Sequence, residues 1–219
     1  DWVMVRDEAE EERLLADAEI MRLALAAFRE LGLPVTVQVN SRRFLDELLA
    51  VCRVPADKAL GAILSLDKLV KYGEAQVRKE LEELGLPRDA IDDILDFPSG
   101  SNAEKLAYYA DLGGEGLAQL QEVFSYLDLP SVEFVPSLAR GLAYYTGTVF
   151  EVYLKDSKIT SSGAAGGRWD RMIGQLLGRG NYPAVGISFG LDVILEAMRI
   201  KESVLPRTEK LFDVGDALR

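Results

Sequence analysis

The chain has 219 residues, of which 48% are hydrophobic and 28% are charged, and this composition is typical of a globular protein with a sizeable core. It contains no histidine and a single cysteine, Cys52, which excludes Ser-His-Asp and Cys-His catalysis, a histidine zinc site and an internal disulfide. The net charge is −11, and residues 1–130 hold 14 basic against 26 acidic side chains. This charge argues against a broad electrostatic grip on nucleic acid. Charges interrupt every apolar stretch, which argues against a membrane-spanning helix, and the lone cysteine fits a reducing cytoplasm.

Residues 1–53 are predicted to alternate between strands and helices. Residues 2–5 form a short strand candidate, and apolar residues from 9 to 31 recur at helical spacing until Gly32 ends the pattern. Residues 35–39 alternate between valine and polar side chains, as a half-buried strand does. Asn40-Ser41 is suited to cap a second helix at its N-terminus.

Residues 54–130 have a different pattern. Apolar stripes at helical spacing are separated by glycine and proline at Gly73, 85–87, 98–100 and 113–114, and nothing alternates as a strand would. The segment is therefore predicted to be an all-helical module of four or five short helices, inserted between two parts of a core, 1–53 and 131–200.

Strand signals return after Pro130. The predicted elements are strands at 132–135 and 148–153, a small-residue turn at 163–167, a helix at 169–177, a strand at 184–189 and a helix at 191–200. Residues 201–219 are predicted to be a linker or frayed tail.

Three clusters in this last part could form a ligand site. In Ala139–Gly147 an arginine, Arg140, stands among glycines, and its planar fork can bind a carboxylate or phosphate through two hydrogen bonds. The adjacent Tyr144 and Tyr145 are expected to point to opposite faces of a strand, so that one lines a pocket. The other clusters, 165–170 and 183–190, place glycines where a ligand or another backbone could approach closely.

Taken singly, each cluster also has an ordinary structural explanation. Gly141 and Gly147 could serve turns, the tyrosines could belong to a strand core, and the arginines could lie on the surface. Gly166-Gly167 matches no phosphate-binding fingerprint.

Together, and in this order, the clusters resemble the signature peptides of histidyl-tRNA synthetases. Residues 140–151, RGLAYYTGTVFE, resemble the family's RGLDYYTGTVFE, and residues 165–170, AGGRWD, resemble its AGGRYD. Residues 183–191 look like the third class II motif, residues 16–20 and 39–43 are similar to further family segments, and the helical module falls where many members carry an insertion. The likeness covers roughly residues 1–200.

The resemblance implies an α+β fold: a class II aminoacyl-tRNA synthetase-like antiparallel sheet flanked by helices, with an all-helical insertion. It implies ATP-dependent activation of L-histidine to histidyl-adenylate and transfer to tRNA(His), with magnesium accompanying ATP, no bound prosthetic group or protein-held metal, and a cytoplasmic homodimer. Arg140 would contact the histidine carboxylate and the α-phosphate of ATP, and Tyr145 an imidazole nitrogen. Histidine would also be bound by Tyr144, Gly166, Gly167, Arg168 and Trp169. ATP would be bound by Arg140, Gly186, Ser188 and Gly190, the last lining the floor of the site with the paired glycines.

The chain departs from the family pattern at several positions. Ala143 stands where the family has aspartate, Trp169 replaces a tyrosine, and Val193 stands where class II enzymes usually place an arginine against ATP. The first two class II motifs and an anticodon-binding domain are not recognised, so we expect a fragment that begins at Asp1 and catalyses poorly or not at all.

Two alternatives remain open from the sequence. One is a synthetase-like paralogue that binds histidine as a regulator, such as the regulatory subunit of ATP phosphoribosyltransferase. The changes at Ala143 and Val193 favour it, and the helical insertion opposes it. The other, which the clustered pocket residues disfavour, is a purely structural or interaction domain.

Overall fold

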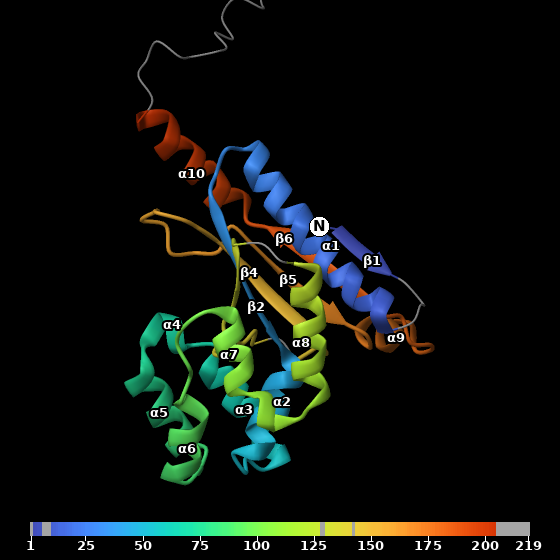
Figure 1. Cartoon of the computed structure of the whole chain (residues 1–219), viewed down its shortest axis with the longest axis vertical. Helices are drawn as coiled ribbons and strands as arrows, with labels where there is room; N and C mark the ends of the chain where they lie inside the picture. Colours follow the sequence, from blue (N-terminus) through green and yellow to red (C-terminus); the bar gives the residue numbers. More distant parts are fainter. Residues whose placement is uncertain (1, 6–9, 128–129, 142, 205–219) are drawn as a thin grey trace, which may run out of the picture.

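A single mixed sheet forms the centre of the molecule. The computed structural model describes residues 2–5, 10–127, 130–141 and 143–204. The strands are β1 (Trp2–Val5), β2 (Val35–Ser41), β3 (Val132–Phe134), β4 (Thr148–Leu154), β5 (Ala164–Trp169) and β6 (Ala184–Phe189). Their order across the sheet is β1-β6-β5-β4-β2-β3. Figure 1 labels these strands except β3. Every neighbouring pair is antiparallel except β2 and β3, which are parallel. The predicted fold class is therefore confirmed, with one parallel pair at the edge.

Helices precede, interrupt and follow the strands. They are α1 (Glu10–Glu30), α2 (Arg42–Val51), α3 (Ala56–Leu66), α4 (Leu69–Tyr72), α5 (Glu74–Glu83), α6 (Arg88–Leu95), α7 (Asn102–Tyr108), the 3-10 helix η1 (Ala110–Leu112), α8 (Glu115–Tyr126), α9 (Met172–Leu177) and α10 (Leu191–Val204). Ser41 caps α2 as predicted, since its hydroxyl accepts a hydrogen bond from the Phe44 amide. The part between β2 and β3 is helical, with more and shorter helices than the sequence predicted.

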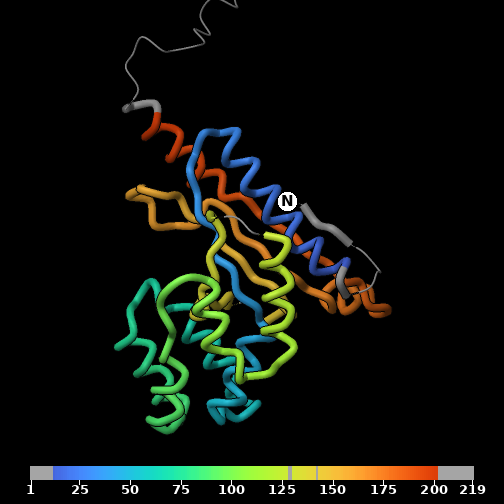
Figure 2. Tube along the Cα trace, in the orientation of Figure 1, coloured from blue at the N-terminus to red at the C-terminus, as the bar shows by residue number. Residues whose placement is uncertain are grey.

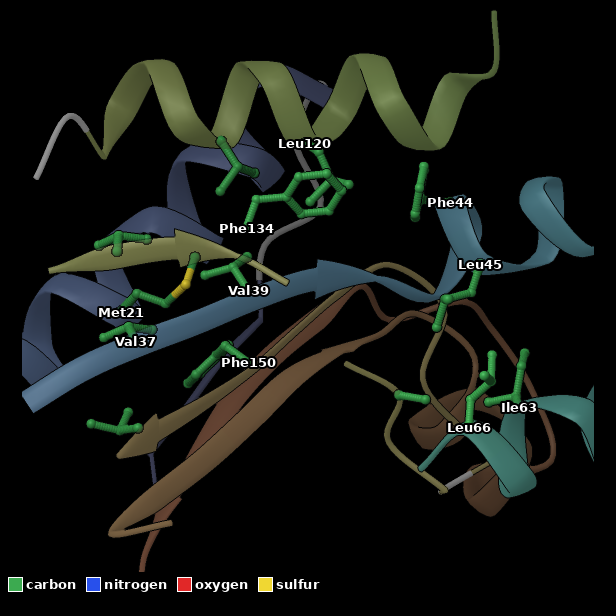
Figure 3. Close-up of a cluster of buried hydrophobic side chains, with 14 of the residues drawn as sticks. Met21, Val37, Val39, Phe44, Leu45, Ile63, Leu66, Leu120, Phe134 and Phe150 are labelled. Carbon is green, nitrogen blue, oxygen red and sulfur yellow. The ribbon is translucent and has the colours of Figure 1, made fainter. Parts of the chain in front are cut away.

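The main hydrophobic core lies between the sheet and two helices, α1 and α8, which cover the same face. Met21 of α1, Leu120 of α8 and the strand residues Val39 and Phe150 are nearly or fully buried there (Figure 3). Phe134 of β3 extends this packing through an edge-to-face contact with Phe44 of α2, at 5.5 Å between ring centroids. The segments that carry the predicted ligand site lie on the opposite face of the sheet.

The helices α4, α5 and α6 lie beside one end of the sheet, away from β1 and α9 (Figures 1 and 2). They bury a smaller set of side chains, including Val77, Leu81 and Ile91. The last helix of the same segment, α8, instead packs against α1 and α2. This part of the chain thus contributes both an outlying group of helices and one layer of the central core.

Two predicted elements are wrong. Residues 164–169 form the interior strand β5 and not a turn followed by a helix, and α9 begins only at Met172. The glycines that suggested a turn are required because β5 is packed closely on both faces and lies between β4 and β6. The predicted tail is helical through Val204, and residues 205–219 lie outside the described part of the chain.

Candidate functional site

The register of the sheet decides which predicted residues share a face. Glu151 of β4 pairs with Ala165 of β5, which pairs with Ser188 of β6. In the next row, Val149 pairs with Gly167, and Gly167 with Gly186. Because residues paired across strands point to the same face, these two rows form one surface, on the side away from α1. The surface has small residues in its middle and Glu151 at one end.

Arg140 reaches this surface from the segment between β3 and β4. Its Nη1 donates a hydrogen bond to Glu151 Oε1 at 2.5 Å, and its guanidinium carbon lies 5.8 Å from the ring centroid of Tyr145. Both side chains of the ion pair are mostly buried, with 20% and 17% of their surfaces exposed. Burial acts to lower the pKa of Arg140, but Tyr145 and Glu151 outweigh it and the pKa is raised. The arginine therefore stays charged and is held in place before any ligand arrives.

Tyr145 covers Gly167. A Cβ built at Gly167 would lie 2.8 Å from the Tyr145 ring and 2.6 Å from the Thr148 carbonyl oxygen, so only glycine fits beneath this ring. Burial is the main cause that raises the pKa of Tyr145, to about 12, and Arg140 opposes it. The phenol therefore keeps its proton at neutral pH and can donate a hydrogen bond.

The two tyrosines do not occupy a strand, so the prediction that they point to opposite faces is wrong. Tyr144 lies in a turn, and Tyr145 in the irregular segment before β4. Their ring centroids are 4.6 Å apart, and both rings contact Trp169 at the end of β5, at 6.0 and 6.2 Å. The result is a three-ring aromatic cluster in which Tyr145 is buried and Tyr144 is 36% exposed. Leu142, within the same predicted peptide, lies outside the described residues.

Gly166 faces the covered side of the sheet. A Cβ at this position would lie 2.1 Å from the Gly186 carbonyl oxygen and 2.6 Å from the Phe150 ring, which belongs to the core under α1. Gly166 and Gly167 therefore point to opposite faces, as neighbours in a strand must. Gly166 supports the surface from below, which corrects the expectation that both glycines would line the ligand site.

Arg168 also points to the covered side and is engaged with protein groups. Its Nη2 and Nε donate to the two carboxylate oxygens of Asp17 at 2.6 and 3.1 Å, and Nη1 donates to Asp170 at 3.2 Å. Thr148 donates a further hydrogen bond to Asp17, at 2.7 Å. Burial raises the pKa of Asp17, while Arg168 and Thr148 act in the other direction. This ion pair joins α1 to β5, so Arg168 has a structural part, and its expected contact with histidine stays a prediction.

The predicted ATP residues lie along β6. Gly186 and Ser188 share the surface of Gly167, and Ser188 is exposed. Gly190 lies just beyond the strand, where its amide donates a hydrogen bond to the Gly163 carbonyl at 2.8 Å. The nearest neighbour of a Cβ there would be the Ser162 carbonyl oxygen at 3.4 Å, an ordinary contact, so close packing does not require glycine at this position.

Sequence reasoning missed two acidic side chains near Arg140. Glu151 stood in the signature peptide without a role, and the β4–β5 register that places it on the site surface is not visible in the sequence. The other is Asp67, the residue that ends α3. Its carboxylate accepts a hydrogen bond from the Gly141 amide, and burial raises its pKa. The helical segment therefore touches the Arg140 peptide directly.

Comparisons with known proteins show the family of the chain. The family model described as histidyl-tRNA synthetase matches residues 10–194. The chain belongs to the histidyl-tRNA synthetase family. It is 42% identical to histidine–tRNA ligase 1 of Bacillus cereus (strain ZK / E33L) over 203 residues, 88% of this chain and 48% of that protein. It is 40% identical over 191 residues to the histidine–tRNA ligase of Aeropyrum pernix, which covers 83% of this chain and 43% of that protein. The chain thus spans about half the length of the curated relatives it matches.

Solved structures show the same fold. A histidyl-tRNA synthetase from Nostoc sp. PCC 7120 superposes with a TM-score of 0.79 at 27% identity, over 93% of this chain and 50% of that one. An ATP phosphoribosyltransferase regulatory subunit/histidyl-tRNA synthetase from Bacillus halodurans superposes with a TM-score of 0.73 at 22% identity, over 90% of this chain and 52% of that one, and shows the fold alone. Within the described residues, no helix is both long and apolar enough to cross a membrane.

Proposed function

We propose that this chain is the part of a histidine–tRNA ligase that binds L-histidine and the α-phosphate of ATP through Arg140. The observation that supports the proposal is the convergence of Arg140, Glu151 and Tyr145 above Gly167 on the uncovered face of the sheet. The named relatives are histidine–tRNA ligases, and the stretch that the family model matches, residues 10–194, includes these residues.

The reaction proposed is an in-line displacement at phosphorus. A carboxylate oxygen of histidine attacks the α-phosphorus of ATP, the bond to pyrophosphate breaks, and histidyl-adenylate forms before the histidyl group passes to tRNA(His). Protein groups take little part in making or breaking bonds in such a step, so catalysis depends on positioning the substrates and on stabilising negative charge. Arg140 suits both tasks because it is charged, largely buried and already oriented by Glu151.

Other residues have supporting parts in this proposal. The protonated phenol of Tyr145 donates a hydrogen bond to an imidazole nitrogen, and Tyr144 and Trp169 complete the aromatic side of the site. Gly186 and Ser188 of β6, and Gly190 just beyond the end of that strand, are small residues that let ATP approach the sheet. Magnesium enters with ATP as part of the substrate complex. We further propose that the complete enzyme works as a cytoplasmic homodimer.

Calorimetry with L-histidine tests the site. We expect the wild-type chain to bind and Arg140→Ala to bind at least tenfold more weakly, which is about 1.4 kcal/mol. Tyr145→Phe removes one hydrogen bond and should weaken binding about fivefold. The matched control is Arg29→Ala, because the Arg29 side chain is 77% exposed and lies on α1. Indistinguishable binding by all four proteins would contradict the proposal.

A second candidate function is a regulator that binds histidine without charging tRNA. Ala143 and Val193, which stand where the family has aspartate and class II enzymes usually have arginine, favour it, whereas the helical segment opposes it. Histidine-dependent exchange of pyrophosphate into ATP, measured on the full-length gene product, separates the two functions. Histidine binding without exchange would assign the regulator.

A further inference from the structure

Tyr153 lies on the same strand as Glu151, two residues farther along β4. Because alternate residues of a strand point to one side, both side chains lie on the uncovered face of the sheet. The Tyr153 hydroxyl donates a hydrogen bond to Glu151 Oε2 at 2.5 Å, while Arg140 Nη1 donates one to Oε1 at 2.5 Å. The two oxygens of one carboxylate therefore have different partners.

The pairing of Arg140 with Glu151 uses fewer hydrogen bonds than the geometry of the two groups allows. A guanidinium and a carboxylate frequently pair through two parallel hydrogen bonds. Arg168 and Asp17 pair in this way, through Nε at 3.1 Å and Nη2 at 2.6 Å. Among the described residues, the only hydrogen bond between Arg140 and Glu151 is the one from Nη1. Glu151 therefore leaves the other donors of this guanidinium unused.

The phenol of Tyr153 is suited to hold Glu151 Oε2. The ring is half-buried, and burial, followed by the hydrogen bond to Glu151, raises the pKa of Tyr153. The phenol is therefore protonated at neutral pH and acts as the donor. A hydrogen bond to an ionised carboxylate is stronger than one between neutral groups, so it opposes rotation of Oε2 toward Arg140.

A second carboxylate near Arg140 is also engaged by another group. The Asp67 carboxylate accepts a hydrogen bond from the Gly141 amide; burial is the main cause that raises its pKa, and the charges of Glu151 and Arg140 act on it in opposite directions. A Cβ on Gly141 would lie 2.9 Å from Asp67 Oδ2, so this close approach depends on glycine. No ion pair joins Asp67 to Arg140 in the described part of the chain. Both acidic neighbours of Arg140 thus have a partner besides the guanidinium.

We propose that Tyr153 is a positioning residue, which restricts Glu151 to one contact with Arg140 by holding its Oε2. The remaining donors of the guanidinium are then available to a carboxylate or phosphate group of the substrates. Without the phenol, Glu151 can rotate and pair with Arg140 through both oxygens, as Asp17 does with Arg168, and this pairing competes with the ligand. The role of Tyr153 rests on the proposed function, in which Arg140 binds the ligand.

Calorimetry with L-histidine on four proteins tests whether Tyr153 acts through Glu151. We expect Tyr153→Phe to bind about tenfold more weakly than the wild type, because the carboxylate then occupies the guanidinium. In a Glu151→Gln background the same change should alter affinity by less than about twofold, because an amide has one oxygen and cannot pair in this way. A loss caused only by a disturbed strand would be equal in the two backgrounds.

Tyr108→Phe is the matched control. It removes a phenol that also donates to a carboxylate, that of Asp96 at 2.7 Å, but lies on α7 in the helical segment. The affinity for L-histidine should not change in this variant. A fall as large as that in Tyr153→Phe would overturn the proposal, because it would show that losing any such hydrogen bond weakens binding.

A crystal structure of Tyr153→Phe without ligand gives a readout that does not depend on histidine binding. We expect two hydrogen bonds between Glu151 and Arg140 in place of one. The proposal is overturned by a variant structure that keeps the single contact, by wild-type affinity in Tyr153→Phe, or by equal losses in the two backgrounds. If the wild-type chain binds no histidine, the proposed function fails, and the contacts of Glu151 in the variant structure still support or overturn the restraint by Tyr153. The same structure decides if Glu151→Gln binds too weakly to measure.

Discussion

The ion pair between Asp17 and Arg168 gives the sharpest prediction about stability. We expect Arg168→Met to lower the free energy of unfolding by about 3–5 kcal/mol, because it leaves a buried carboxylate without its charged partner. Asp17 is completely buried, and it loses two hydrogen bonds while keeping the one from Thr148. For a chain of this length about 2–4 °C is lost per kcal/mol, so the melting temperature should fall by roughly 6–20 °C.

The pH dependence of stability in the same variant follows from the direction in which the pKa of Asp17 is shifted. Burial raises the pKa of Asp17 above its value in the unfolded chain, so the folded protein takes up this proton more readily. The contribution of this carboxyl group to stability is therefore fully present below the unfolded pKa and is lost as pH rises through the folded pKa. Without Arg168 the folded pKa rises further, so Arg168→Met should be closest to wild type in acid and weakest at neutral pH.

Urea denaturation at several pH values, followed by circular dichroism, measures both effects. The double variant Asp17→Leu/Arg168→Met removes both charges and should recover most of the loss, because a buried ion pair can often be replaced by apolar side chains. Arg29→Met is the control and should change stability by less than about 0.5 kcal/mol, since its side chain is exposed. A loss below about 1 kcal/mol in Arg168→Met, or a double variant no more stable than the single one, would refute the structural role of Arg168.

Two further predictions concern a residue of the sheet and a residue of α7 that bonds to its edge strand β3. Gly167→Ala should weaken L-histidine binding at least tenfold in calorimetry. The reason is that its methyl group would lie 2.8 Å from the Tyr145 ring and 2.6 Å from the Thr148 carbonyl oxygen. Unchanged affinity would show that the position of the Tyr145 ring does not shape the site. Lys105→Met should lower the free energy of unfolding, measured by urea denaturation, by about 1–3 kcal/mol, because the buried ammonium donates a hydrogen bond to the Phe134 carbonyl at 2.9 Å. An unchanged free energy of unfolding would show that this hydrogen bond contributes nothing.

Local patterns predicted most of the elements correctly. Alternating valines predicted β2, the spacing of apolar residues predicted α1, and Asn40-Ser41 predicted the start of α2. These predictions succeed because each pattern reports burial of one face of one element. The parallel pairing of β2 with β3 could not be predicted in the same way, because it depends on where the helical segment between them returns the chain.

The arrangement of the candidate site residues could be predicted only in part. Arg140 and Tyr145 lie together as the peptide implied, because both belong to one short segment. Arg168 was assigned to histidine by the family resemblance, whereas alternation along β5 turns it toward α1. No sequence pattern indicated that Asp67 lies near the site, because its contact with Gly141 joins parts of the chain that are distant in sequence.

The error at residues 164–169 has the most informative cause. Glycine is a poor strand former, so Gly166-Gly167 favoured a turn on local grounds. In the sheet each glycine satisfies a different long-range demand: Gly166 admits the Phe150 ring on the covered face, and Gly167 admits the Tyr145 ring on the other. Sequences that violate a local preference in the interior of an element do so where something else requires the space. Here the requirement on the uncovered face is space for the Tyr145 ring, which the proposed histidine site includes.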